Sequence, residues 1–192
     1  QQGDIVVRHA QLQAQAVLTP FATWPLDTLD ASFDALDLSA LASAAPSTAL
    51  SGSARARLGS AGSAGPRPVE LNLQLSNARA DRWDGGRLPL RRADVRARSV
   101  SLDPDDGVVL ESFDLSLGSA QHEAGRVRGE GRWAPAAWQL ALEVASLDPS
   151  GLDARAPALR LSGPISLASV AGRAPQAVQV RARLVGRQGN GK

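Results

Sequence analysis

Two histidines are the only residues of this 192-residue chain that could act as an imidazole base or an imidazole metal ligand. A Ser-His-Asp triad needs such a base near neutral pH. His9 stands beside a predicted N-terminal strand, and His122 stands next to Glu123 in a predicted hairpin loop. We interpret both as exposed loop side chains. The absence of cysteine excludes disulfides, thiolate catalysis and cysteine-ligated metals.

The carboxylates and glycines form no recognisable catalytic motif either. Asp103, Asp105 and Asp106 are the tightest acidic cluster, but a calcium loop needs more oxygen ligands at alternating positions, so we interpret them as an acidic turn. The stretch 59–65 is rich in glycine and serine without forming a Gly-x-Ser-x-Gly elbow. The only lysine is Lys192, which argues against a phosphate-binding loop. We therefore expect no enzyme activity, with no catalytic residue, cofactor or metal.

Charge and aromatic content argue against a nucleic-acid partner. The formal net charge is +2, and 21 basic residues are interspersed with 19 acidic ones. Nucleic-acid binders concentrate their positive charge and interleave it with aromatic side chains, which make up only 4% of this chain. Trp83, Trp133 and Trp138 could form a sugar-stacking platform, but we interpret them as hydrophobic plugs at the ends of a sheet. No apolar run reaches the roughly 18 residues that span a bilayer.

Strict alternation of apolar with polar residues is the dominant pattern, and it predicts half-buried strands. The clearest run is 69–76, where Val69, Leu71, Leu73 and Leu75 alternate with polar residues. Equivalent runs predict strands over 113–117, 138–144, 159–161 and 178–184, and weaker runs predict strands over 12–18, 29–35, 50–58, 93–102 and 127–133. We predict an all-β fold of about eleven strands in an elongated, curled antiparallel sheet, with one or two short helical turns.

Turn-forming residues separate these runs. Residues 105–107 and 134–136 predict short hairpin connections, and 60–68 predicts a flexible surface loop. Residues 77–89 predict a longer loop that carries Trp83. No stretch has a sustained 3.6-residue apolar period, so long helices are not expected.

A short motif recurs at an offset of 111 residues. Leu36-Asp37 recurs as Leu147-Asp148, Ala45-Pro46 as Ala156-Pro157, and Leu50-Ser51-Gly52 as Leu161-Ser162-Gly163. In each copy the aspartate predicts the cap of a helical turn, and Pro149 occupies the first position of the second turn. We expect a repeat over about 24–58 and 138–170, stacked within one continuous segment covering residues 1–192.

The repeated Leu-Asp-x-Ser…Ala-Pro…Leu-Ser-Gly motif and the loop 77–90 resemble the central region of the TamB family, the AsmA-like translocation and assembly module proteins. The resemblance runs from about Trp24 to Leu184, and because the chain begins at Gln1 and contains no methionine we expect an interior segment of a longer protein. The resemblance implies a periplasmic protein, anchored in the inner membrane by a segment outside this chain, with a U-shaped trough called a β-taco. It also implies phospholipid transport toward the outer membrane, outer-membrane protein assembly with a TamA-like barrel as partner, and no catalytic residues.

The apolar face of such a trough would line a groove for phospholipid acyl chains. The residues that we assign to this groove are Val69, Leu71, Leu73, Leu75, Phe113, Leu115, Leu117, Leu140, Leu142, Val144, Leu159, Leu161, Val178, Val180 and Leu184. Small residues at Gly52, Ala54, Ala56, Ala93, Ala97, Gly129 and Gly131 leave room for a curve or a ligand, which favours a trough. Two alternatives stay open: a closed β-sandwich scaffold, and an open sheet edge that templates a client strand by β-augmentation.

Overall fold

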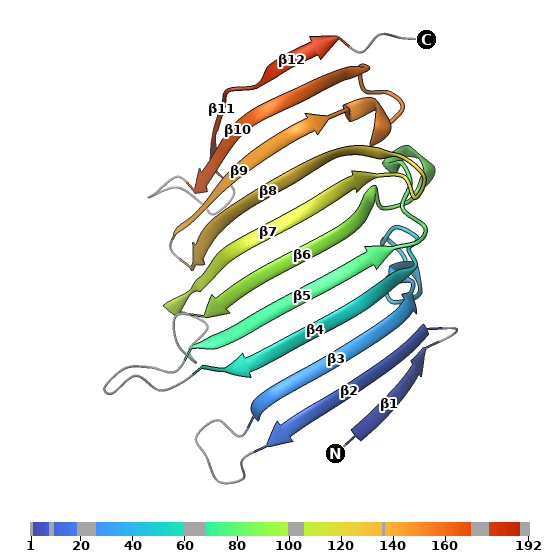
Figure 1. Ribbon diagram of the computed structural model, residues 1–192, viewed down its shortest axis with the longest axis vertical. Coiled ribbons are helices and arrows are strands. Elements are labelled where there is room, and N and C mark those ends of the chain that lie inside the picture. Colours follow the sequence, from blue (N-terminus) through green and yellow to red (C-terminus); the bar gives the residue numbers. More distant parts are fainter. Residues whose placement is uncertain are drawn as a thin grey trace.

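The described part of the chain forms one twisted sheet of twelve strands (Figure 1). The structure is a computed structural model that describes residues 2–7, 10–18, 26–59, 68–99, 106–135, 137–169 and 177–188. The strands are β1 Gln2–Val7, β2 Ala10–Leu18, β3 Leu26–Leu36, β4 Leu50–Leu58, β5 Val69–Asn77, β6 Leu90–Ser99, β7 Val108–Gly118, β8 Glu123–Ala134, β9 Ala137–Leu147, β10 Leu159–Ser169, β11 Val178–Ala182 and β12 Val185–Gln188.

The topology is a simple antiparallel meander. Each strand from β1 to β11 pairs with the next in the sequence, and β12 pairs with the part of β10 that β11 leaves free. The N- and C-terminal strands therefore lie at opposite ends of the stack (Figure 1). The predicted fold class is confirmed: the chain is all-β, and its sheet is elongated, curled and not closed into a barrel.

Several element boundaries differ from the prediction. Three single 3-10 turns are described, where one or two were expected: η1 Leu38–Ala40, η2 Trp83–Gly85 and η4 Pro149–Gly151. The strand predicted over 159–161 continues to Ser169, and the one predicted over 178–184 is split into β11 and β12. Strand β1 precedes 12–18, the first of the predicted strand ranges. Residues 60–67 of the predicted surface loop, together with Trp24, lie outside the described residues.

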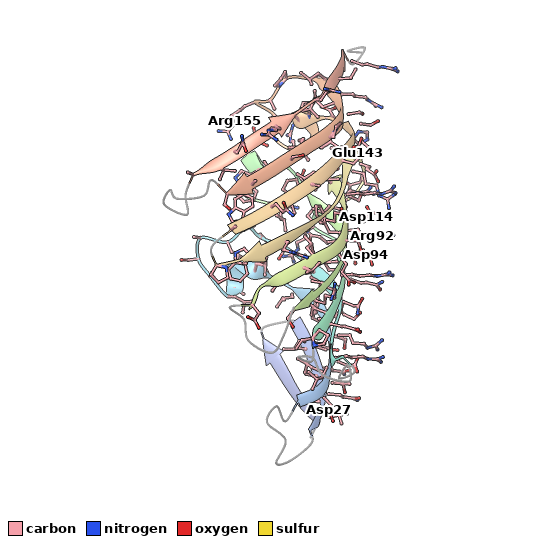
Figure 2. All side chains as sticks on the ribbon, turned by 90° about the vertical axis from the view of Figure 1, so that its left-hand side faces the viewer. Asp27, Arg92, Asp94, Asp114, Glu143 and Arg155 are labelled. Carbon is pink, nitrogen blue, oxygen red and sulfur yellow. The ribbon has the colours of Figure 1, made fainter. Side chains whose placement is uncertain are left out.

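The connections at the right-hand end of the sheet in Figure 1 fold together into a cap. We define the cap as residues 37–49, 78–89, 119–122 and 148–158. The Trp83 amide donates to the Leu152 carbonyl at 2.8 Å, which joins the connection between β5 and β6 to the connection between β9 and β10. The Ser47 amide donates to the Gly86 carbonyl at 3.1 Å. Arg155 of the cap lies on the opposite side of the sheet from Asp94, Asp114 and Glu143 (Figure 2).

The two copies of the recurring motif adopt the same local structure. Asp37 and Asp148 are the N-caps of η1 and η4, with φ −101° in both, and each carboxylate accepts the amide of the serine two residues later. The residues two positions before the caps, Ala35 and Ser146, have φ of 52° and 51°. Each sits in a β-bulge and donates its amide to a serine hydroxyl on the next strand, Ser51 or Ser162.

Candidate functional site: the apolar face of the sheet

The strand register places apolar residues of successive strands directly opposite one another. Because side chains alternate across a strand, residues paired in this way share one face of the sheet. One line of partners runs Ala14, Ala31, Ala54, Leu73, Val95, Phe113, Gly129, Leu142 and Ile165, from β2 to β10. We call the face that contains this line the apolar face. From β4 to β10 no charged residue stands among the paired residues of this face.

The structure places fourteen of the fifteen predicted groove residues on the apolar face. Leu184 is the exception, because it lies in the short link between β11 and β12, where no pairing defines a face. Exposure differs along the face. Val144 is only 3% exposed near the cap, whereas Leu71 is 41% and Val180 is 60% exposed. The other side chains of the set are mostly half-buried, by neighbours within the same sheet.

No second sheet packs on the apolar face in the described part of the chain, because all of its strands belong to one sheet. The closed β-sandwich, in which two sheets pack face to face, is therefore not the arrangement observed. The most deeply buried residues instead gather at the capped end. They include Thr48, Leu50, Ala80, Ala124 and Val144.

The small residues of β8 do not leave empty space. A Cβ atom on Gly129 would stand 2.7 Å from the ring of Phe113, and one on Gly131 would stand 2.8 Å from the Leu140 side chain. Large residues on the neighbouring strands thus lie over these glycines. The room that we expected there for a ligand is occupied by the sheet itself, so ligand contact would be made with the side chains that project beyond it.

Several residues of the apolar face escaped the sequence analysis. Ile165 and Leu167 continue the alternation of Leu161 past Pro164, and this signal was available. Leu110 and Leu90 were hidden, because register shifts in β7 and β6 change which residues share a face. The bulge at Ser146 likewise brings Leu147 onto the face that carries Val144.

Two tryptophans meet at the uncapped end of the apolar face. Trp133 and Trp138 are direct partners across the β8–β9 hairpin, and Trp133 is 47% exposed. This position agrees with the interpretation of these residues as sheet-end side chains. Trp83 lies instead in the cap, 55% exposed.

The opposite face carries charged and polar side chains, which project to one side of the sheet (Figure 2). We call it the polar face. Many of its arginines pair with carboxylates: Arg55 with Asp30, Arg98 with Glu111 at 2.9 Å, and Arg128 with Asp114 at 3.0 Å. Arg126 also binds Asp114, and its hydrogen bonds hold the pKa of that carboxyl below its usual value. Opposite charges on adjacent strands offset the repulsion between like charges.

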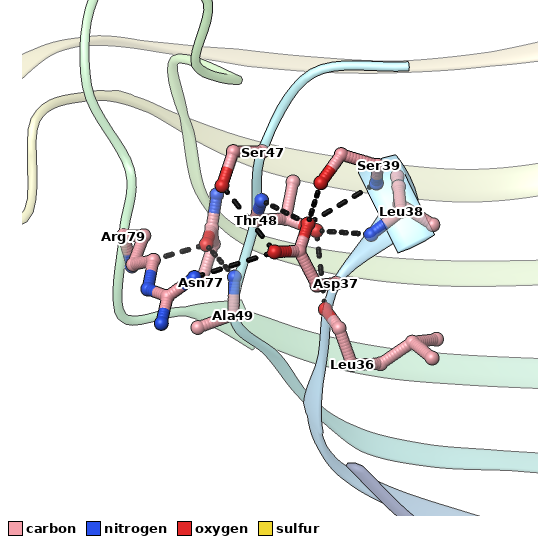
Figure 3. A network of polar contacts seen from close by, with 9 residues as sticks. All are labelled: Leu36, Asp37, Leu38, Ser39, Ser47, Thr48, Ala49, Asn77 and Arg79. Atoms are coloured by element: carbon pink, nitrogen blue, oxygen red, sulfur yellow. Dashed lines mark hydrogen bonds and ion pairs between the residues drawn. The ribbon is translucent and has the colours of Figure 1, made fainter. Parts of the chain in front are cut away.

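A polar network holds the capped end together (Figure 3). The Asp37 carboxylate accepts the Thr48 amide at 3.0 Å and the Ser39 hydroxyl at 2.8 Å, and it pairs with Arg79 at 3.3 Å. The Thr48 amide, followed by Ser39, holds the pKa of Asp37 below its ordinary value. Asn77 supports the network by accepting the amides of Ala49 and Arg79.

The residues first considered for chemistry do not come together. His122 is exposed in the turn between β7 and β8. His9, Asp103 and Asp105 lie outside the described residues. Within the described ranges no group of three or more His, Cys, Asp or Glu side chains could hold a metal ion. None of the helical turns in those ranges is long and apolar enough to cross a membrane.

Comparisons with protein-family models, with curated proteins and with solved structures find no match. The fold and the site define the class of the protein by themselves. It is an open meander of twelve strands in the described residues, apolar on one face, charged on the other and capped at one end.

Proposed function

We propose that this chain is a segment of a periplasmic lipid conduit, as its resemblance to the TamB family implies, and that its apolar face contacts phospholipid acyl chains. The observation that carries this proposal is the unbroken line of apolar partners from β2 to β10, with no second sheet over it in the described residues. Contiguous apolar surface left open on a folded protein commonly marks a site of interaction. We propose no enzymatic activity for this chain.

The dimensions of the sheet suit this role. Because β11 and β12 both pair with β10, the strands form a stack of eleven rows, which at a spacing of about 4.8 Å extends roughly 50 Å along the hydrogen-bonding direction. An acyl chain that covers this face removes apolar surface from water, which stabilises the complex by roughly 25 cal/mol per Å². Because no charged residue interrupts the paired positions from β4 to β10, a chain could move along them without having to desolvate a charge.

The wider role follows from the resemblance. We propose that the conduit joins the inner and outer membranes, that phospholipids are its cargo, and that it supports outer-membrane protein assembly with a TamA-like barrel. The inner-membrane anchor and the contacts with the barrel would belong to parts of the protein outside this chain.

A photo-crosslinking amino acid at two adjacent positions tests the groove directly. Leu73 lies on the apolar face, and Gln74, its neighbour in β5, lies on the polar face opposite Asp94. In the full-length protein in cells, we expect the probe at Leu73 to capture phospholipid and the probe at Gln74 to capture none. Equal labelling at both positions, or no lipid at Leu73, would contradict the proposal.

Charge insertion tests whether lipid contact matters for function. Leu73→Arg and Leu142→Asp place a charge on the apolar face, where it would face acyl chains. Gln74→Arg, opposite Asp94, and Gln139→Asp, opposite Arg132, make matching changes on the polar face. We expect all four variants to fold, because no sheet opposes either face. Cells that carry Leu73→Arg or Leu142→Asp should lose outer-membrane integrity, and cells that carry either polar-face variant should keep it. Unfolding of both apolar-face variants would instead indicate a packed core.

The open sheet keeps β-augmentation as a second candidate function. The open sheet has two edges, β1 at one and β11 with β12 at the other, and unpaired edge strands can template a client strand. Crosslinking distinguishes the two functions, because a client strand would be captured by probes in β1 or β12 and phospholipid by the probe at Leu73.

A further inference from the structure

The formal charge of the chain is divided unequally along the stack of strands. Seven of the 21 basic residues and none of the 19 acidic ones follow Asp153, so the remaining 14 basic residues share residues 1–153 with all 19 acidic ones. Residues 1–153 therefore carry a formal charge of −5, and residues 154–192 carry +7. Within the described residues of this part, Arg155 lies in the cap and pairs with Asp153. The strands β10, β11 and β12, with the link between the last two, contain four arginines and no acidic residue, so they form a cationic end of the sheet (Figure 1).

Three arginines of this end share the polar face. Arg160 on β10 is the direct partner of Arg187 on β12, and Arg181 on β11 is the partner of Ser166. All three side chains are exposed. Like charges placed directly opposite one another destabilise a sheet, so this arrangement is unfavourable for the isolated fold.

Carboxylates do not compensate these arginines within the described residues. Elsewhere on the polar face arginines pair with Asp30, Glu111 and Asp114, but no such ion pair involves Arg160, Arg181 or Arg187. The polar face of the neighbouring strand β9 carries one carboxylate, Glu143, which stands opposite Arg128 on β8 and Pro164 on β10 and forms no ion pair with these three arginines. Glu123 and Asp148 line the same pocket as Arg160, but Glu123 pairs with Arg91 and the Asp148 carboxylate accepts from Ser150. An anionic partner would therefore meet arginines that no ion pair neutralises within the described residues.

An exposed apolar side chain stands among these arginines. Val185 is the partner of Ser162 on β10, which places it on the polar face two residues before Arg187, and it is 66% exposed. Cationic side chains beside an exposed apolar one are typical of surfaces that bind anionic membranes. Nucleic-acid surfaces add aromatic side chains for stacking, and β10 to β12 contain none.

We propose that the polar face of β10 to β12 docks on an anionic phospholipid bilayer, with Arg160, Arg181 and Arg187 binding lipid phosphates. The guanidinium group can bind phosphate in a bidentate manner and stays charged at all physiological pH values. Val185 enters the headgroup region beside them. This docking surface lies on the face opposite the acyl-chain groove, and it does not require the groove to carry lipid.

Vesicle co-sedimentation tests the proposal. We expect the protein to bind vesicles that contain phosphatidylglycerol and not vesicles of pure phosphatidylcholine, with binding that weakens as salt screens the charges. Replacement of Arg160, Arg181 and Arg187 together by serine should reduce partitioning on the order of 100-fold, since each arginine near an anionic bilayer contributes about five-fold. The control variant replaces Arg57, Arg92 and Arg96, three exposed arginines of the central polar face, by serine.

The control carries the same change in net charge, so it should keep most of the binding. Equal losses in the two variants, or equal binding to both vesicle types, would overturn the proposal. Binding to a DNA duplex in place of the anionic vesicles would overturn it in favour of nucleic acid. Failure here is distinct from failure of the groove, because the three-serine variant should still be crosslinked to lipid at position 73, and Leu73→Arg should still bind anionic vesicles.

Discussion

Asp37 shows how one side chain can organise the end of a sheet. Its carboxylate caps η1 and accepts the amide of Thr48, which lies just before β4. It also pairs with Arg79, which lies in the connection between β5 and β6. Asp148 occupies the equivalent position of the second copy, but within the described residues its carboxylate accepts only the amide and the hydroxyl of Ser150. The Asp37 side chain therefore links its cap to other connections, whereas the second copy is tied into the tertiary structure through backbone hydrogen bonds, those of Asp148 with Ala124 and of Leu152 with Trp83.

This difference predicts unequal effects of the same substitution. At neutral pH we expect Asp37→Asn to lower the free energy of unfolding by about 1–2 kcal/mol, because charge-assisted hydrogen bonds are lost, and Asp148→Asn to lower it by less. The pKa of Asp37 is lowered in the folded state, so its stabilising contribution is present above the ordinary value of 3.8 and is lost as the pH falls through the lowered pKa. Urea unfolding at several pH values measures both effects. A deficit in Asp37→Asn that stays constant well below pH 3.8 would contradict this assignment.

At the scale of elements, β-bulges decide how the strands enter the cap. Ala35 and Ser146 adopt the left-handed conformation although neither is glycine, and each is the extra residue of its strand. Bulges of this kind increase the local twist and redirect the strand. At these two sites they bring Leu36 and Leu147 onto the apolar face, next to the cap.

Substitution of alanine by valine should lower stability much more at the bulge than in a regular strand. Ala35→Val should lower the free energy of unfolding by about 1–2 kcal/mol, because a β-branched side chain is strained at positive φ. Ala141→Val is the matched control, since Ala141 is also exposed but lies in the regular middle of β9. The control should change stability by no more than about 0.5 kcal/mol. Thermal or urea unfolding of the two variants compares them, and a similar loss in both would show that the bulge is not the cause.

At the scale of the whole molecule, the fold is a plate of strands that stabilises itself mainly through neighbouring strands. Most contacts between elements join strands adjacent in the sheet, and η4 adds contacts with β8 and β10. The sheet therefore grows along one axis instead of closing around a central core. Repeat-like architectures with this property are elongated and depend on nearest-neighbour interactions.

The shape can be measured directly. A compact domain of this length has a radius of gyration of about 16 Å. The eleven rows of strands form a plate of roughly 50 Å by 35 Å, which predicts a radius of gyration of roughly 18–20 Å. Small-angle X-ray scattering of the monomeric chain measures it, with a globular protein of similar mass as the standard. A value at the compact limit would show that the sheet closes on itself in solution.

The sequence alone determined the all-β class, the two faces of the sheet and the capping turns. Alternation such as that of Val69 to Leu75 is a local property, because successive side chains of any strand point to opposite faces. The aspartate caps at Asp37 and Asp148 are equally local, since the carboxylate binds an amide two residues away. For the same reason the predicted groove residues within one regular strand could be assigned to a common face.

Only the tertiary structure decided which strands share a register, what covers each face and where charge is left uncompensated. Leu90 and Leu110 joined the apolar face through register shifts that no alternation pattern records. The space above Gly129 is taken by Phe113 from another strand, and Arg160 meets Arg187 across two strands that are far apart in the sequence. These features depend on contacts between residues distant along the chain, and the period of a single strand carries no information about its neighbours.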